Sequence, residues 1–441
     1  MPPLTEPPRN RFELADVELL DDVVRRAAAY LQSASTRSVV PSASAVDAMQ
    51  ELARPLPESS CPAREVVALL DRFGSPATAV TNGGRFYGFV NGGCVPASTA
   101  ASWLAAAWDQ NAALRVMSPA AAVFEDVTLG WVRDILGLPA GCDGAIVTGA
   151  TMANFVALAA ARHALLNRAG WDVDNDGLFG APPITVVVGD EVHVSLIKAL
   201  GLLGLGRRRV RRVAVDGQGR MRVDALPTEL DDLTIVCIQA GNVNSGAFDP
   251  ARELCERAHQ HGAWVHVDGA FGLWAASSPR YRHLVEGFAA ADSWATDGHK
   301  WPNVGYDCGL AFVRQPNALR AAMSTSSAYF VPGEQREPSQ FTPEMSRRAR
   351  GVELWATLRA LGRGGLADLI DRTCDHAKAF AVGLRDAGAE ILNEVVINQV
   401  LVSFGSPDLT KAVIARVQQD GVCWCGGTEW QGQTEIGRAH V

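Results

Sequence analysis

Lysine is rare in this chain, and one lysine lies where it could do chemistry. Four of the 40 cationic side chains are lysines, namely Lys198, Lys300, Lys378 and Lys411. Lys300 follows Asp-Gly-His in a segment without the charge pattern of a surface helix. Arginine serves equally well for solubility, but its guanidinium stays protonated and cannot form an imine with an aldehyde. A lysine at this position therefore favours Schiff-base chemistry over the alternative of an ordinary surface lysine.

A carboxylate precedes this lysine at the end of an expected strand. Asp268 ends the apolar run Trp-Val-His-Val-Asp. A buried carboxylate is costly unless a cation or hydrogen-bond donors compensate it. A protonated pyridine nitrogen would compensate it, and the protonated ring is the electron sink of pyridoxal 5′-phosphate. Asp268 and Lys300 together predict a site for this cofactor, whereas Asp268 alone could equally cap the next turn.

Further candidate residues follow other expected strands. The turn Thr148–Thr151 joins a strand to a helix, and its small residues and the helix N-terminus suit a phosphate, although the same residues also make an ordinary helix cap. His193 could lie flat on an aromatic cofactor or be a core residue. Asn244 could hydrogen-bond the cofactor, and His299 could donate to its phosphate.

The candidates lie at the ends of strands in an alternating pattern. Apolar runs alternate with helical stretches at 144–148, 154–167, 184–188, 195–203, 234–238, 250–261 and 264–268. Continuous apolar strands separated by helices indicate a mostly parallel sheet with helices on both faces. Ligands collect at the carboxyl ends of such strands. The sequence therefore predicts an α/β fold with a single site at that edge of the sheet.

The chain is long enough for more than one core, since it has 441 residues. We predict an N-terminal helical arm at 1–80, a cofactor-binding large domain at 81–325 and a small α+β C-terminal domain at 326–441. The tail Glu435–Val441 reads, when back-translated, like a sequencing-adapter oligonucleotide. We therefore expect that the tail is artefactual and that the small domain is truncated in this sequence.

Composition excludes several kinds of partner. The net charge of −8 gives no support for nucleic-acid binding. No uncharged apolar run reaches the roughly 18 residues of a membrane span, and the N-terminus lacks the pattern of a signal peptide. Nine scattered cysteines suit a reducing cytoplasm, and their spacing does not favour a metal site. We expect a cytoplasmic protein without nucleic-acid, membrane or metal partners.

The order and spacing of these motifs resemble the group II pyridoxal phosphate-dependent amino acid decarboxylases, which include the aromatic amino acid, glutamate and tyrosine decarboxylases. The matching motifs are Thr-Gly-Ala-Thr, His193, Asn244, His-Val-Asp-Gly-Ala and Asp-Gly-His-Lys-Trp. The resemblance covers roughly residues 80 to 430. It implies the aspartate aminotransferase-like fold (fold type I), an amino acid as the small-molecule substrate, and a homodimer with active sites at the interface.

The resemblance also implies residue roles. Lys300 would be the Schiff-base lysine, Asp268 the partner of the pyridine nitrogen, and His193 the residue stacked on the ring. The other residues implied in binding the cofactor are Gly149, Ala150, Thr151, Asn244, Ala270 and His299. The residues implied on the substrate side are Phe89, Val90 and Asn91, of which the first two favour an aromatic or aliphatic substrate side chain.

The implied activity is decarboxylation of an L-amino acid to carbon dioxide and an amine, but the sequence departs from the family at one point. Family decarboxylases carry a mobile-loop tyrosine that is implicated in protonating the α-carbon. The matching segment 338–348 contains no tyrosine, and Pro338 or Phe341 falls at that position, with Tyr329 upstream. Relatives with phenylalanine there resemble aldehyde synthases, in which oxygen intercepts the carbanion. A decarboxylation-dependent aldehyde synthase is therefore one open alternative. The adapter-like tail leaves a second one, a truncated, non-catalytic protein of this fold.

Overall fold

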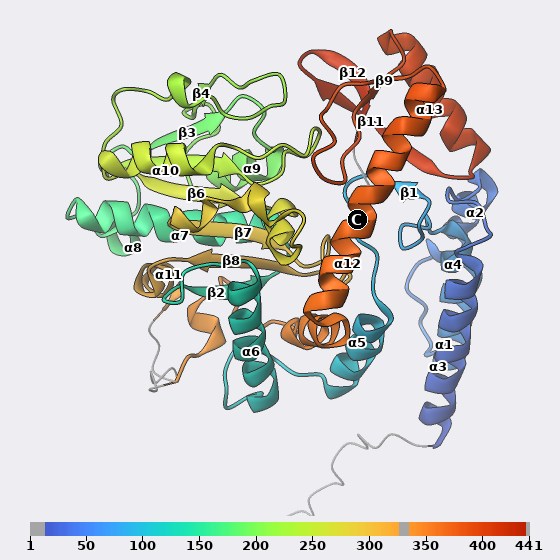
Figure 1. Ribbon diagram of the computed structural model, residues 1–441. Helices are drawn as coiled ribbons and strands as arrows, with labels where there is room; N and C mark the ends of the chain where they lie inside the picture. Colours follow the sequence, from blue (N-terminus) through green and yellow to red (C-terminus); the bar gives the residue numbers. More distant parts are fainter. Residues whose placement is uncertain (1–13, 326–334, 438–441) are drawn as a thin grey trace, which may run out of the picture. The chain divides into compact units, whose positions relative to one another are not determined.

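The computed structural model describes residues 14–325 and 335–437 (Figure 1). Tyr329 of the loop segment and residues 438–441 of the adapter-like tail lie outside the described residues. The rest of that tail, Glu435–Gly437, belongs to the last strand, β12 (Gln433–Gly437). None of the described helices combines the length and the apolar character that crossing a membrane requires.

The chain forms two compact units, which are Met1–Tyr87 with Ala412–Cys425 and Gly88–Lys411 with Gly426–Val441. The smaller unit is mostly helical, with α1 (Leu14–Ser33), α2 (Ala43–Ala48), α3 (Ala63–Leu69), α4 (Ser75–Ala77) and most of α13 (Pro407–Asp420). Its strand β1 (Phe86–Tyr87) pairs in parallel with the start of β11 (Trp424–Trp430), and the rings of Phe86 and Trp424 stack 4.6 Å apart. The domain division at residues 80 and 325 stays a prediction.

A seven-stranded sheet is the framework of the larger unit, in the order β2-β8-β7-β6-β5-β3-β4 (Figure 1). Its strands are β2 (Asp143–Val147), β3 (Thr185–Gly189), β4 (Arg211–Val213), β5 (Thr234–Gln239), β6 (Trp264–Asp268), β7 (Ser293–Asp297) and β8 (Gly309–Val313). Strands β3 to β7 pair in parallel, whereas β8 runs antiparallel to β2 and β7. The predicted mostly parallel sheet is confirmed; β4, β7 and β8 were not predicted.

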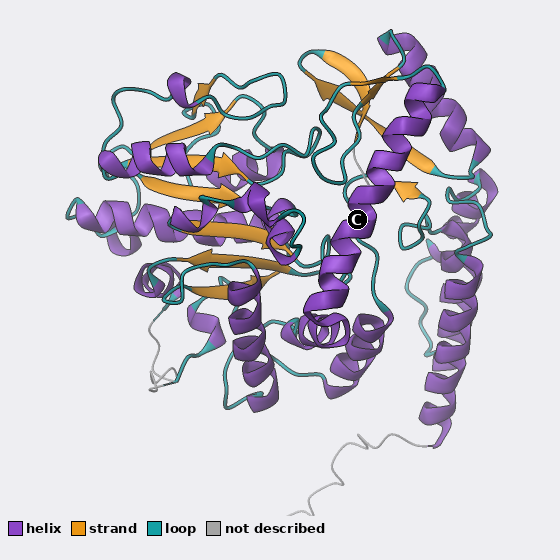
Figure 2. Ribbon diagram, viewed as in Figure 1, coloured by secondary structure: helices purple, strands orange, loops and turns teal. Residues whose placement is uncertain are grey.

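Helices bury both faces of this sheet (Figure 2). They are α6 (Pro119–Ile135), α7 (Ala150–Arg168), α9 (Val194–Leu202), α10 (Ala251–Gln260), α11 (Pro316–Met323) and α12 (Gly351–Asp386). Helix α5 (Pro96–Trp108) packs on α12 instead, and the short α8 (Val173–Asp176) packs on α7. Helices α7, α9 and α11 pack on one face, and α6, α10 and α12 on the other. Side chains alternate between the faces along each strand. Val186 and Val188 of β3 therefore pack toward α7, while Val187 packs toward the opposite cluster.

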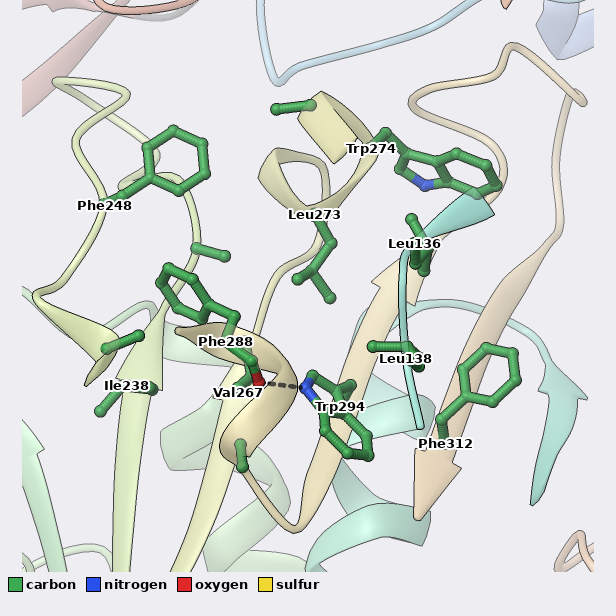
Figure 3. Close-up of a cluster of buried hydrophobic side chains, with 14 of the residues drawn as sticks. Leu136, Leu138, Ile238, Phe248, Val267, Leu273, Trp274, Phe288, Trp294 and Phe312 are labelled. Carbon is green, nitrogen blue, oxygen red and sulfur yellow. Dashed lines mark hydrogen bonds between the residues drawn. The ribbon is translucent and has the colours of Figure 1, made fainter. Parts of the chain in front are cut away.

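The cluster on the α6, α10 and α12 face is rich in aromatic residues (Figure 3). Trp294 of β7 is 1% exposed, and its indole N–H donates to the carbonyl of Phe288 over 2.9 Å. Buried tryptophans normally need such a partner for the indole N–H. The cluster thus holds β7, which leads to the Lys300 loop, against the helices of this face.

The last part of the larger unit is a small antiparallel sheet. Strand β10 (Val402–Ser403) pairs with β9 (Glu390–Ile391) and β12, and β12 pairs with the end of β11. It follows α12, which is interrupted at Gly362, where φ is 60° and ψ is −178°. The sequence pattern predicts two separate helices at 347–360 and 366–387, and the interruption falls between these ranges.

We expect Trp294→Ala to destabilise the protein by about 3–5 kcal/mol, because it empties a fully buried site. Phe179→Ala is the control, since Phe179 is 97% exposed and should change stability by less than about 0.5 kcal/mol. Urea unfolding followed by circular dichroism measures both. Equal midpoints for the two variants would show that the cluster does not support the sheet.

Candidate active site

The Lys300 amine pairs with a buried carboxylate that the sequence analysis missed. Lys300 lies in the loop after β7, and its Nζ is 3.1 Å from Oδ2 of Asp297, the last residue of that strand. Asp297 is 2% exposed, and its Oδ1 accepts the backbone N–H of Ala150 over 2.5 Å. Asp297 therefore ties the Lys300 amine to the N-terminus of α7. Its position at a strand end, three residues before the lysine, is the signal that could have identified it.

His299 lies between this carboxylate and a tyrosine. Its Nε2 is 3.7 Å from Asp297 Oδ2, and its ring centroid is 4.5 Å from that of Tyr306. Burial lowers the pKa of His299, which favours the neutral ring, although the nearby Asp297 opposes this. Its Nδ1 accepts the backbone N–H of Cys308 over 3.4 Å, so the neutral ring carries its proton on Nε2.

The N-terminus of α7 forms a tight cradle of backbone beside His299. A Cβ on Gly149 would lie 3.1 Å from His299 Cε1, and one on Gly309 would lie 2.4 Å from Gly149 Cα. The N–H of Ala150 already donates to Asp297. Because the first N–H groups of a helix have no helical acceptor, that of Thr151 is available to an anion.

Asp268 ends β6, where it is paired in register with Gln239 of β5 and Ala295 of β7. It is 5% exposed, and its Oδ2 accepts a hydrogen bond from Asn154 Nδ2 over 3.2 Å. Burial raises the pKa of Asp268, and the charges of His193 and Lys300 oppose that rise. The structure thus brings Asp268, His193 and Lys300 into one electrostatic cluster. A carboxylate whose pKa is still raised is one that a further cation would stabilise.

His193 stands immediately before α9 and is oriented by Ser195. Its Nδ1 accepts the backbone N–H of Ser195 over 3.3 Å and lies 2.7 Å from the Ser195 hydroxyl. When the ring is neutral, its proton is therefore on Nε2. Ala270, also predicted in the site, accepts the backbone N–H of Asp297 over 2.9 Å.

Asn244 makes its contacts elsewhere. It is buried in the turn after β5, and its Oδ1 accepts the Thr428 hydroxyl over 2.8 Å. Its own backbone N–H donates to Asn242 Oδ1 over 2.9 Å. Among the described residues, none of the hydrogen bonds of Asn244 joins it to Lys300 or Asp268.

The segment expected on the substrate side lies against the Lys300 loop. A Cβ on Gly92 would lie 2.1 Å from the Lys300 carbonyl oxygen, and Asn303 Nδ2 donates to the Gly92 carbonyl. Phe89 and Val90 both adopt left-handed backbone, with φ of 57° and 55°, which is strained for a β-branched residue. Strain of this kind concentrates at functional sites.

Two aromatic residues complete the site and were not anticipated. The Tyr306 hydroxyl donates to Asn91 Oδ1 over 2.7 Å, so it links the segment before α5 to the ring packed on His299. The Phe271 ring lies 5.8 Å from Lys300 Nζ. Phe271 follows Asp268 closely in the sequence, and Tyr306 follows Lys300, which is the only signal that either carries.

The tyrosine-free segment is partly in the core. Pro338–Gln340 form a buried 3-10 turn, and Phe341 is buried in the cluster of α7 and α11. The Arg336 guanidinium lies 4.2 Å from the Phe341 ring centroid. Phe341 is therefore a core residue rather than a side chain of the Lys300 site.

Comparison with known proteins gives a consistent picture. The model of the pyridoxal-dependent decarboxylase conserved domain matches residues 77–405. An aromatic-L-amino-acid decarboxylase of Bacillus atrophaeus is 27% identical over 351 residues, which are 76% of this chain and 71% of that protein. A phenylacetaldehyde synthase of a Rosa hybrid cultivar is 30% identical over 289 residues, 60% of this chain and 55% of that protein. The chain thus spans little more than half the length of the rose enzyme.

A solved structure shows the same fold. The crystal structure of Oryza sativa TDC with PLP and tryptamine superposes with a TM-score of 0.90 at 24% identity, and the match covers 99% of this chain and 94% of that chain. The predicted fold type I architecture is confirmed.

The residues at the strand ends fit pyridoxal 5′-phosphate. The under-compensated Asp268 carboxylate suits a protonated ring nitrogen, and the Lys300 amine suits an aldehyde. The backbone cradle at Gly149 and the helix N-terminus suit a phosphate, because a side chain there would fill the space.

We expect Gly92→Ala to lower activity about a hundredfold, since its Cβ would push the segment away from the Lys300 loop, and misplacement by about 1 Å has effects of this size. Gly84→Ala is the matched control, because a Cβ there meets nothing within 4 Å. Steady-state decarboxylation assays compare the two variants. Wild-type activity in Gly92→Ala would separate this segment from the site.

Proposed function

Because the chain belongs to the pyridoxal-dependent decarboxylase family, we propose that it removes the α-carboxyl group of an L-amino acid as carbon dioxide and releases the amine. The observation that carries the proposal is the cluster of the Lys300 amine and the Asp268 carboxylate at the ends of two adjacent parallel strands. His193 belongs to the same cluster. An amine, a buried acid and an imidazole together are the groups that such a cofactor requires.

Each group has a proposed role. Lys300 would attach the aldehyde, Asp268 would pair with the ring nitrogen, and His193 would stack on the ring. When bound, pyridoxal 5′-phosphate supplies an electron sink for the pair of electrons left by the departing carboxylate. The further residues proposed to bind the cofactor are Gly149, Ala150, Thr151, Asn244, Ala270 and His299. Of these, Asn244 has the weakest support, because its amide oxygen is engaged by Thr428.

Asp297 prepares the lysine. Its carboxylate is 3.1 Å from Lys300 Nζ, so it orients the amine. It also holds the Ala150 N–H, so a movement of the Lys300 loop would disturb the start of α7. Asp297 is thus proposed to keep the amine and the phosphate cradle in a constant relative position.

The substrate side favours an apolar side chain. Phe89 is 57% exposed beside the Lys300 loop, and Val90 and Asn91 follow it. The Asn91 amide oxygen already accepts a hydrogen bond from the Tyr306 hydroxyl. The aromatic rings are therefore the main surfaces left to contact a substrate. We expect amino acids with aromatic or aliphatic side chains to be better substrates than acidic ones.

A decarboxylation-dependent aldehyde synthase is the second candidate. It is favoured by the tyrosine-free segment and by the similarity to the rose phenylacetaldehyde synthase. The amine product is favoured by Tyr306, which provides a tyrosyl hydroxyl at the site from a different loop. The two products differ in their need for oxygen, which makes them easy to separate.

The proposed assembly is a homodimer that acts in the cytoplasm. Large apolar side chains are exposed on and after α5, as expected of a surface that a second copy covers; they are Trp103, Leu104, Trp108, Val116 and Met117. The nine cysteines are all free, which suits a reducing compartment.

We expect borohydride reduction of the enzyme with pyridoxal 5′-phosphate to leave a fluorescent pyridoxyl group on Lys300, identified by peptide mass spectrometry. Lys300→Ala should lose both the label and the activity. Lys378→Ala is the control, because Lys378 donates to Tyr281 away from the cluster. A labelled but inactive wild-type protein would favour the non-catalytic alternative.

We expect turnover to release equal amounts of carbon dioxide and amine without oxygen uptake. An aldehyde synthase would instead consume one oxygen and one water per turnover and release aldehyde, ammonia and hydrogen peroxide. An oxygen electrode with peroxide and amine assays, run on a panel of L-amino acids, decides between them. Oxygen consumption equal to carbon dioxide release would reject the amine product.

A further inference from the structure

A line of buried, hydrogen-bonded polar side chains, which we call the relay, leads from Asp268 into the core. Asn154 of α7 donates from Nδ2 to Asp268 over 3.2 Å, and its Oδ1 is 2.8 Å from Nε2 of His266. Nδ1 of His266 is 2.9 Å from the Ser293 hydroxyl, which accepts the indole N–H of Trp264 over 2.9 Å. These residues come from α7, β6 and β7, so the relay crosses three elements.

The sequence places three of these residues on one face of a strand. Side chains alternate along β6, so Trp264, His266 and Asp268 share one face, while Val265 and Val267 pack in the cluster on the other. The first face meets α7, which supplies Asn154. A pattern of tryptophan, histidine and aspartate at alternate positions therefore builds a line of polar groups toward the strand end.

Each hydrogen bond of the relay has a single possible direction from donor to acceptor. The Trp264 indole can only donate, and an ionised Asp268 can only accept. Burial lowers the pKa of His266 to about 3, so the ring is neutral and carries one proton. That proton lies on Nε2, because the Asn154 amide donates to Asp268 and must accept at its oxygen. Nδ1 therefore accepts from the Ser293 hydroxyl.

Burying polar side chains at these positions costs free energy, and the packing of the core does not require them. Asn154, His266 and Ser293 are fully buried, and a valine or leucine could fill such positions without any need for partners. A fully connected network rigidifies its members and fixes their orientation. The relay orients the Asn154 amide so that its N–H, and not its oxygen, faces the Asp268 carboxylate.

We propose that Asn154 and His266 are positioning residues that hold Asp268 as an oriented, ionised acceptor for the ring nitrogen of the cofactor. His266 acts through Asn154, because its Nε2–H fixes the amide so that Nδ2 donates to Asp268. The inference rests on the proposed cofactor site at Lys300 and Asp268. Without the relay, burial favours the neutral form of Asp268, which pairs less well with a protonated ring.

Two substitutions of His266 separate this role from simple packing. His266→Gln keeps a donor near the position of Nε2 and so can still fix Asn154. His266→Asn keeps only a group near Nδ1 and reaches Ser293 instead. Both residues are polar and smaller than histidine, so both variants lose packing. Asn154→Leu removes the donor to Asp268 itself.

The experiment measures the dissociation constant of pyridoxal 5′-phosphate from each apoprotein and the pH midpoint of the visible absorbance of the bound cofactor. We expect His266→Asn and Asn154→Leu to weaken binding about tenfold or more and to shift the midpoint, since a hydrogen bond to a charged group is lost. His266→Gln should bind within about threefold of wild type. The double variant His266→Asn, Asn154→Leu should bind no more weakly than Asn154→Leu alone, because one residue acts through the other.

Thermal unfolding of the apoproteins is recorded alongside, with Thr234→Val as the control. Thr234 is buried at the start of β5 and bonds to Asp231 outside the relay, so its loss should lower stability without changing cofactor binding. Additive losses of affinity in the double variant would overturn the relay but not the proposed cofactor site. The same conclusion follows if His266→Asn and Asn154→Leu both keep the wild-type affinity and pH midpoint. A wild-type protein that does not bind the cofactor would overturn the proposed site, and the relay with it.

Discussion

Two carboxylates buried at the ends of adjacent strands are the constraint on which the site depends. Asp297 is compensated inside the protein, by the Ala150 N–H and the Lys300 amine. Asp268 is compensated less completely, because burial still raises its pKa despite the Asn154 amide and the neighbouring charges. The first carboxylate therefore stabilises the loop that carries the lysine. The second carboxylate, Asp268, would be stabilised further by a cationic group of a ligand. This edge of the sheet is therefore suited to binding a ligand rather than to closing the core.

The framework that holds these carboxylates requires very close backbone contacts. Gly309 and Gly149 approach so closely that a Cβ would not fit, and Gly92 does the same beside Lys300. These contacts bring β8, the start of α7 and the segment before α5 to the same place. Helix and strand packing alone leaves more space between elements. The glycines therefore explain how the Lys300 loop can lie next to both the start of α7 and the segment that we propose on the substrate side.

Much of this arrangement could be predicted from the sequence, and the exceptions have physical reasons. Strands β2, β3, β5 and β6 are continuous apolar runs, which is the signal of a buried parallel strand. Strand β7 contains Ser293, Thr296 and Asp297, so it does not read as an apolar run and was not predicted. Asp297 was missed for the same reason. The contacts of Asn91 with Tyr306 and of Asn244 with Thr428 join residues far apart in the sequence. No local pattern encodes such pairs, because they depend on how the chain closes.

The two sides of the site are held in different ways, and this difference bears on how specificity can change. The cofactor side is buried and determined by hydrogen bonds that each have one direction, so a substitution there disturbs several groups. The proposed substrate side consists of the exposed Phe89 on strained backbone, linked to the Lys300 loop through Asn91 and Tyr306. A change at Phe89 alters the surface offered to a substrate while Asp268, Asp297 and Lys300 keep their partners. Substrate preference can therefore vary in this fold without loss of the cofactor chemistry.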